Sequence, residues 1–491
     1  MHAPPKAALV LAGLCAWAGP AVARDTLVMG MVLEPPHLDP TAGAAAAIDE
    51  VVYANIFEGL TRIDAEGAVR PALATGWQIS DDGLTYTFDL ADDVTFHDGA
   101  TFDSSDVLFS FDRAMAEDSV NAQKGLFEPI ESVEAPDEDT IVIRLKRPTG
   151  DLLFDLGWGD AVIVDPASAE TNKSRPIGTG PFRFAEWRKG DAIRLERSET
   201  YRGDPVALRT ATFKIIPDPA AATAAMMAGD VDAFANFPAP EALAQFEADP
   251  RFSVVIGSTE GETILAMNNG RPPLDDLRVR RAITRAIDRQ AVIDGAMYGY
   301  GLAIGSHFSP NHPAHVDLTD VNAYDVDAAW ALLAEAGIVD LQLEMKLPPP
   351  SYARRSGEII QAQLAEVGIT VHIVPVEWAQ WLEQVFTNKD YDLTIVAHTE
   401  PMDIGIYARD DYYFNYRNDA FTALMDELAA TTDEAARNAL LGRAQRILAE
   451  DAVNVFLFQL PKYGVWNAKL EGLWHDSPIQ ANDLTAVHWS E

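Results

Sequence analysis

The chain has 491 residues, of which 48% are hydrophobic and 23% are charged, and its formal net charge is −38. This length exceeds one ordinary hydrophobic core, so two or three domains are expected. The charge makes nucleic acid and anionic membranes poor partners, because both would be repelled. It favours cationic or zwitterionic ligands, although adaptation to a salty medium would produce the same composition.

The first 23 residues have the three parts of a secretory signal peptide. A short start containing Lys6 is followed by an apolar stretch at 7–19 and by the small residues Ala-Val-Ala at 21–23. This order predicts cleavage after Ala23 and export to the periplasm. The one cysteine, Cys15, lies inside this segment and follows Leu14 rather than a small residue. Lipid attachment is therefore not expected.

The first third of the mature chain is predicted to be rich in β-structure. Apolar and polar residues alternate over 76–99, with hairpin turns indicated at Asp82-Gly83 and Asp98-Gly99. A helix is predicted over 102–115. The segment 175–203 reads as a glycine-rich turn and two strands. It lacks the lysine of a phosphate-binding loop, and a strand follows the turn where such a loop leads into a helix.

The segment 274–293 is predicted to form one amphipathic helix. Its apolar stripe recurs with helical spacing. Four arginines lie on the other side and are interpreted as a solvated face: Arg278, Arg281, Arg285 and Arg289.

Strands and helices then alternate, which predicts a parallel sheet covered by helices. The expected helices are 324–337, 356–368 and 378–386, and the expected strands are 341–347, 369–376 and 391–397. A helix at 435–451 and a strand pair at 452–466 follow.

Two loops lie where strands of this sheet end, and ligands of such sheets bind beyond the carboxyl ends of the strands. The first, 348–355, carries Arg354 and Arg355, and the second, 398–407, carries Asp403 among apolar residues. Tyrosines crowd after this acid, at Tyr407, Tyr412, Tyr413 and Tyr416. They would either wall a cleft or belong to the core.

No catalytic or metal-binding motif is evident in the sequence. It contains neither HExxH nor a G-x-S-x-G turn after a strand. Histidines cluster only at His307, His312 and His315, whose loop spacing matches no known zinc site. We therefore expect no enzymatic activity, no metal and no cofactor.

Four long blocks resemble the family-5 extracellular solute-binding proteins of ABC importers, which include dipeptide, oligopeptide and nickel receptors. The blocks are YTFDLADDVTFHDGATFDSSDVLFSFDR (86–113), PIGTGPFRFAEWRKGDAIRLERSETYRG (176–203), MNNGRPPLDDLRVRRAITRAIDRQAVI (267–293) and YDVDAAWALLAEAG (324–337). They occur in the family's order, and the resemblance as a whole extends over nearly all of the mature chain.

The resemblance implies an α/β fold of the bilobed periplasmic binding protein type. Two mixed-sheet lobes would be joined by a two-strand hinge, with an extra β-rich subdomain in the first lobe. The expected division is signal peptide 1–23, first lobe 24–265, second lobe 266–464 and a C-terminal return to the first lobe at 465–491.

The resemblance also implies a binding site between the lobes. Asp403 matches the acid that pairs with the ligand's α-amino group in dipeptide receptors, and Arg354 or Arg355 matches the arginine that pairs with its carboxylate. Met402, His398 and Tyr407 accompany the acid. In this chain Ile404 replaces the proline that commonly follows the acid, and His398 stands where dipeptide receptors often have tryptophan. The spacing of Pro401, Met402 and Asp403 resembles nickel-type receptors more closely.

The predicted function is capture of a small zwitterionic ligand, such as a di- or oligopeptide or an amino-acid derivative. A monomeric receptor would deliver it to the permease and ATPase complex of an ABC importer. The alternatives are a receptor for nickel or another metal chelate, or for an oligosaccharide. A periplasmic hydrolase or chaperone on the same scaffold is a further alternative, which the absence of a nucleophile motif disfavours.

Overall fold

The computed structural model describes residues 24–43, 45–399, 402–431 and 433–490. The predicted signal peptide and its cleavage site lie outside the described residues. Among the helices described, none combines the length and the apolar character needed to cross a membrane.

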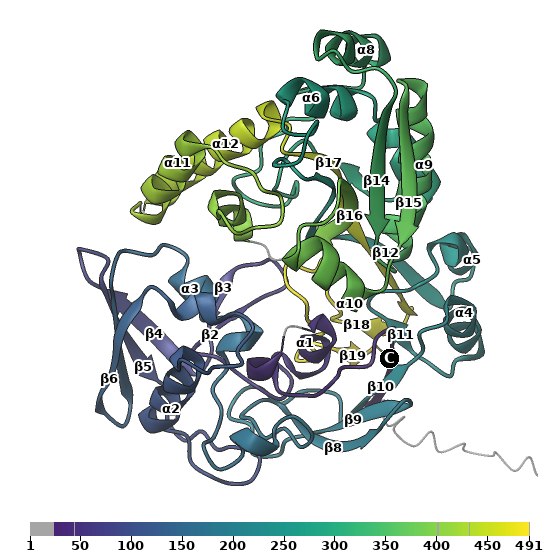
Figure 1. Ribbon diagram of the computed structural model, residues 1–491. Helices are drawn as coiled ribbons and strands as arrows, with labels where there is room; N and C mark the ends of the chain where they lie inside the picture. The colour runs from purple at the N-terminus through teal and green to yellow at the C-terminus, as the bar shows by residue number, and fades with distance from the viewer. Residues whose placement is uncertain (1–23, 44, 400–401, 432, 491) are drawn as a thin grey trace, which may run out of the picture.

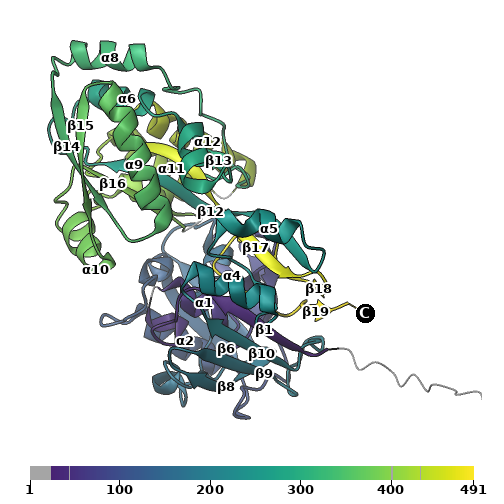
Figure 2. The same ribbon diagram turned by 90° about the vertical axis from the view of Figure 1, so that its right-hand side faces the viewer.

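Two lobes share one mixed sheet of 11 strands (Figure 1). Ten strands follow the path β15-β14-β16-β12-β17-β11-β1-β10-β9-β8, and the eleventh, β13 (Leu302–Ala303), pairs with β17. The antiparallel strands β12 (Phe252–Met267) and β17 (Asn454–Asn467) run from one lobe into the other (Figure 2). Their register shifts between Ser258 and Glu262. Such irregularities bend a strand, and this one separates the first-lobe part of β12 from its second-lobe part.

The second lobe has helices on both faces of parallel strands, as the alternating pattern predicts. β14 (Leu341–Leu347) pairs in parallel with β15 (Ile369–Pro375) and β16 (Leu393–His398). One face packs against α6 (Leu277–Arg285), α7 (Arg289–Met297), α8 (Val326–Glu335) and α9 (Ser351–Glu366). The other packs against α10 (Trp378–Trp381), α11 (Asp419–Ala429) and α12 (Glu434–Glu450).

The first lobe continues the sheet and adds the predicted β-rich subdomain. Its sheet strands are β1 (Thr26–Met31), β8 (Phe182–Arg188), β9 (Ala192–Arg197), β10 (Thr210–Ile215) and β11 (Ala233–Phe234). α1 (Ala46–Val52) packs in the core of this lobe, while α4 (Pro219–Ala228) and α5 (Leu243–Glu247) join the core that also contains α6 to α9. The chain returns to this lobe near its end, where Trp489 Nε1 donates a hydrogen bond to the Thr26 carbonyl at 3.0 Å.

The subdomain is a separate four-stranded antiparallel sheet. Its order is β4 (Ala74–Ile79), β5 (Thr85–Leu90), β7 (Thr140–Leu145) and β6 (Ile130–Asp137). The expected helix forms as α2 (Ser104–Met115), and its apolar face packs on this sheet. Gly83 and Gly99 have φ values of 68° and 94°, which confirms the two predicted turns, because this backbone conformation favours glycine.

The prediction of a single helix over 274–293 is wrong. Asp288 accepts a hydrogen bond from the Ala291 N–H and starts a new helix, so the segment forms α6 and α7. The restart also explains why Arg289 is not part of a solvated face. Its side chain is 8% exposed, and Nε donates to the Phe456 carbonyl at 2.6 Å.

Three other boundaries differ from the predictions. The strand pair expected at 452–466 is one continuous strand, β17, because it must reach across both lobes. The helix expected at 378–386 is the short α10 followed by a π-helix at Leu382–Thr387. The helix expected from 356 begins at Ser351, which places Arg354 and Arg355 among its first five residues.

Candidate functional site

A short 3-10 helix beyond the carboxyl end of β16 carries Asp403. It spans Asp403–Ala408, and residues 400–401, between it and β16, lie outside the described residues. Ile404, Ile406 and Tyr407 are 8% exposed or less and pack into the core beside α11 and α12. These three side chains anchor the turn, and Asp403 remains 18% exposed.

The partner of Asp403 is a buried histidine, His307, from the loop after β13 (Leu302–Ala303). His307 Nε2 lies 2.9 Å from Asp403 Oδ1, and Nδ1 lies 2.9 Å from Glu262 Oε1 on β12. Glu262 and His307 are 2% and 1% exposed. Both ring nitrogens face a carboxylate, which is the environment of a doubly protonated imidazolium. We call these three residues the acid-histidine cluster.

Two carboxylates hold the proton on this histidine. Burial disfavours the charged form, but Glu262 and Asp403 outweigh it and raise the pKa of His307 to about 10. His307 is therefore a cation at neutral pH, placed between two acids. Burial raises the pKa of Glu262 to about 8, which favours the neutral form of that acid, so the charged partner of His307 at neutral pH is Asp403.

The same three residues are the set that could hold a metal ion in the described part of the chain. Each offers one ligand atom, and these atoms lie within 4.8 Å of one another. However, the two carboxylates lie at different nitrogens of the ring. A metal would have to displace at least one of these pairings, so the geometry is that of a charge cluster.

The other histidines of the predicted loop have separate partners. His312 stacks on Phe308, with ring centroids 3.9 Å apart, and its Nε2 lies 3.5 Å from Met402 Sδ. His315 Nδ1 contacts the Phe308 carbonyl at 3.0 Å. The zinc site considered for His307, His312 and His315 is thus not assembled.

The remaining predicted residues of this loop are mostly buried. His398 is 8% exposed, and its Nε2 lies 2.9 Å from the Tyr413 hydroxyl. Tyr407 is 2% exposed and stacks on Phe414, with centroids 5.0 Å apart. All four tyrosines that follow the acid are 8% exposed or less and belong to the core: Tyr407, Tyr412, Tyr413 and Tyr416.

A cavity of about 640 Å³ lies between the lobes beside this loop. The first lobe contributes Asp151 and Phe154, and the second contributes His312, Met402 and Arg437. The volume suits a small ligand. Arg437 Nη2 reaches across to Asp151 Oδ1 and Oδ2 at 2.6 and 2.5 Å, so an ion pair joins the lobes at this cavity.

Comparison with known proteins agrees with this arrangement. The family described as "Bacterial extracellular solute-binding proteins, family 5 Middle" matches residues 68–419. This chain belongs to that family. It is 29% identical to Heme-binding protein A of Haemophilus influenzae over 429 residues, 78% of each chain. It is 27% identical to Oligopeptide-binding protein AppA of Bacillus subtilis over 485 residues, 91% of this chain and 88% of that protein.

The solved structures show the same bilobed fold. DppA of Helicobacter pylori, in complex with the peptide STSA, matches 95% of this chain and 98% of its own, with a TM-score of 0.83 and 24% identity. The family-5 protein described here is therefore the substrate-binding component of an ABC importer. It is a secreted, periplasmic protein, in a family of transport components rather than enzymes.

The two predicted arginines of this solute-binding protein lie at the start of α9. Arg354 Nη2 is 3.9 Å from Glu377 Oε1, and its Nε donates to the Pro348 carbonyl at 3.3 Å. The Arg355 guanidinium lies 5.1 Å from the centre of the Tyr298 ring. α9 packs on one face of the sheet, and the Asp403 turn packs on the other. Arginines and acid are thus separated by the sheet edge.

The sequence alone did not predict a site role for Glu262, and His307 was interpreted only as a loop histidine. A glutamate among the apolar residues of ETILAM (262–267) was the available signal, because a buried acid requires a partner. The pair Asp151 and Arg437 is separated by 286 positions, and no sequence pattern points to it.

Proposed function

We propose that this solute-binding protein captures a small zwitterionic, peptide-like ligand and that Asp403 pairs with its α-ammonium group. The position of Asp403 is the observation that supports this proposal. It is held by the buried His307 and adjoins Met402, which lines the interlobe cavity. AppA and the peptide complex of DppA support the same ligand class.

Arg354 or Arg355 is the proposed partner of the ligand carboxylate. A carboxylate at the start of α9 would also gain from the positive end of the helix dipole. Because these arginines and Asp403 lie against opposite faces of the sheet, the ligand would extend around the strand ends. His398 and Tyr407 would act by supporting the loop that carries Asp403.

A metal chelate is the second candidate. His312 and Met402 meet at the cavity wall with a nitrogen and a sulfur 3.5 Å apart, and such groups suit nickel and other transition metals. A gain in thermal stability with a nickel–histidine complex, and none with peptides, would favour this candidate.

Cleavage after Ala23 would release a monomer that begins at Arg24. The loaded receptor would pass its ligand to the permease and ATPase complex at the inner membrane. The mass of the exported protein and its N-terminal sequence test the cleavage site.

Calorimetric titration of the mature protein with Ala-Ala and N-acetyl-Ala-Ala tests the role of Asp403. Acetylation removes the ammonium, so it should weaken binding at least tenfold, since charge-assisted hydrogen bonds contribute about 1.5–3 kcal/mol. Asp403→Asn should bind both peptides equally weakly. Asp410→Asn, at an exposed neighbour, is the matched control. Unchanged affinity for Ala-Ala in Asp403→Asn would rule out this role.

A further inference from the structure

A second, smaller cavity of about 90 Å³ also lies between the two lobes. Its wall includes Asp49 from α1 and Trp158, Gly159 and Asp160 from a neighbouring 3-10 turn of the first lobe. Thr399, which directly follows β16, approaches from the second lobe. The cavity therefore opens beside the loop that carries Asp403.

Two acids in this cavity have oxygens without a partner. Asp49 Oδ1 and Asp160 Oδ1 are both inaccessible to solvent, and neither forms a hydrogen bond with any residue described. Asp160 as a whole is only 5% exposed. The Asp160 carboxylate accepts hydrogen bonds from the Trp158 side chain and the Gln123 N–H. A buried carboxylate oxygen without a partner is nevertheless costly, and two such oxygens belong to acids that line one cavity.

The backbone makes room for this arrangement. A Cβ atom on Gly159 would lie 2.2 Å from Asp49 Oδ1, so any other residue would push the carboxylate out of its position. The absence of a side chain at Gly159 lets the Asp49 carboxylate lie directly against the turn that carries Asp160.

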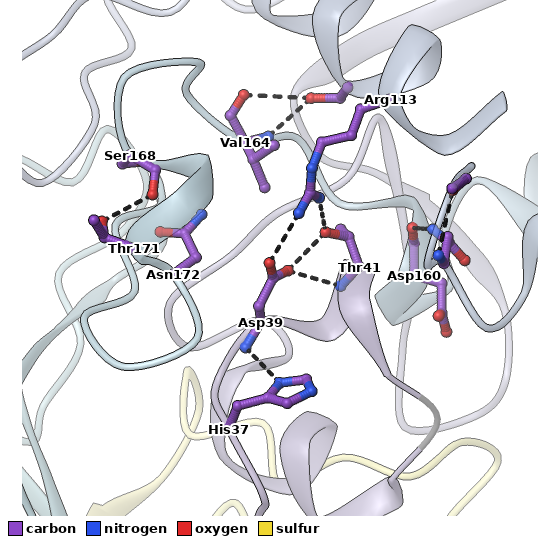
Figure 3. A network of polar contacts seen from close by, with 12 residues as sticks. His37, Asp39, Thr41, Arg113, Asp160, Val164, Ser168, Thr171 and Asn172 are labelled. Carbon is purple, nitrogen blue, oxygen red and sulfur yellow. Dashed lines mark hydrogen bonds and ion pairs between the residues drawn. The ribbon is translucent and has the colours of Figure 1, made fainter. Parts of the chain in front are cut away.

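Among the residues that the structure describes, no cation lines the cavity beside these acids. The described lining of the cavity includes no lysine, arginine or histidine. Arg113 is in the same lobe, but its guanidinium pairs with Asp39 at 3.1 Å and with the Thr41 hydroxyl, and Asp160 stands apart from it (Figure 3). Burial raises the pKa of Asp160 to about 7. Burial, with Asp160 nearby, raises the pKa of Asp49 well above its usual range.

From this geometry we infer that Asp49 and Asp160 form a subsite for a second positive charge of the ligand, the ammonium or guanidinium of a basic side chain. The inference rests on the proposed function and narrows it to peptides or amino-acid derivatives that carry a lysine- or arginine-like group. The incoming cation would meet the unpartnered oxygen of each carboxylate, and the lining rings of Tyr53 and Trp158 suit a cation as well.

Matched dipeptides test the subsite by calorimetric titration. Ala-Lys and Lys-Ala are compared with Ala-norleucine and norleucine-Ala, which keep the length of the side chain but lack its charge. The wild-type protein should bind at least one lysine peptide about tenfold to a hundredfold more tightly than its norleucine analogue. In Asp49→Asn and in Asp160→Asn this preference should fall to about twofold or less.

Two further variants separate this subsite from the Asp403 site. Asp403→Asn should weaken every peptide and keep the lysine preference. Asp92→Asn, which removes an exposed acid of the first lobe, should change neither property. Equal binding of lysine and norleucine peptides by the wild-type protein, with Asp403 still required, overturns the subsite and leaves the proposed function intact. If no peptide binds, both are overturned.

The stability of the ligand-free variants provides an independent measurement. A buried carboxylate oxygen that binds only the ligand destabilises the ligand-free protein. Asp49→Asn should therefore unfold at the same temperature as the wild-type protein or at a higher one. A lower unfolding temperature would mean that Asp49 serves the fold, which contradicts the inference.

Discussion

At the scale of single residues, the acid-histidine cluster positions the Asp403 carboxylate. The carboxylate does not stand alone, because His307 approaches one of its oxygens and is held in turn by Glu262. The cluster links β12, which both lobes share, to the loop beside the interlobe cavity. His307 is thus a positioning residue for the proposed ammonium site.

We predict that His307→Gln strongly destabilises the fold. The change removes the buried cation that pairs with Asp403 and also contacts Glu262, and breaking a buried ion pair costs about 3–5 kcal/mol. Urea unfolding measures the loss in unfolding free energy. His315→Gln, at a partly buried loop histidine, is the control. A loss equal to that of the control would show that the charge of His307 contributes little.

At the scale of secondary-structure elements, the sequence predicts the bounds of a strand or helix well where residues inside that segment and next to it determine them. The strand at 341–347 was predicted with its observed bounds, because apolar residues and flanking turns define it without outside help. The segment 274–293 has an apolar stripe that runs without a break, but the cap at Asp288 divides it. The apolar stripe indicates which helix face is buried, and both short helices bury this face. It does not indicate that one helix ends and another begins.

Two aspartates, Asp103 and Asp106, cap the start of α2. Asp103 accepts from the Ser105 N–H at 2.7 Å, and Asp106 accepts from the Asp103 N–H at 2.9 Å. Asp103→Ala should lower the unfolding free energy by about 1 kcal/mol, because it leaves N–H groups at the helix start without a partner. Asp92→Ala should change it by less than about 0.5 kcal/mol. Equal values from chemical unfolding would contradict the capping role.

At the scale of the whole molecule, the relation between the lobes depends on few contacts. β12 and β17 provide the covalent and hydrogen-bonded link. Arg437 on α12 and Asp151 beside α3 (Leu152–Asp155) add an ion pair at the edge of the cavity. Arg437 also donates to the carbonyls of Leu428 and Thr431 within its own lobe, so it is held in position for Asp151.

We predict that Asp151→Ala favours a more open arrangement of the lobes. It removes the contact across the cavity while Arg437 keeps its bonds within the second lobe. Small-angle scattering of the ligand-free protein should show a larger radius of gyration than for the wild type. Glu66→Ala, at an exposed acid lining the same cavity, is the control. An unchanged radius in Asp151→Ala would mean that β12 and β17 alone fix the lobes.

The sequence by itself determined the family, the parallel pairing of strands in the second lobe and the place of Asp403 after a buried strand. These features depend on periodicity and on residues close together in the chain. Tertiary structure alone decided that His307 meets both Glu262 and Asp403 and that Arg437 meets Asp151. It also decided that Asp49 and Asp160 share a cavity whose described lining contains no cation. Charge compensation inside a protein depends on which distant segments share a small, poorly solvated volume, and a linear pattern does not encode that proximity.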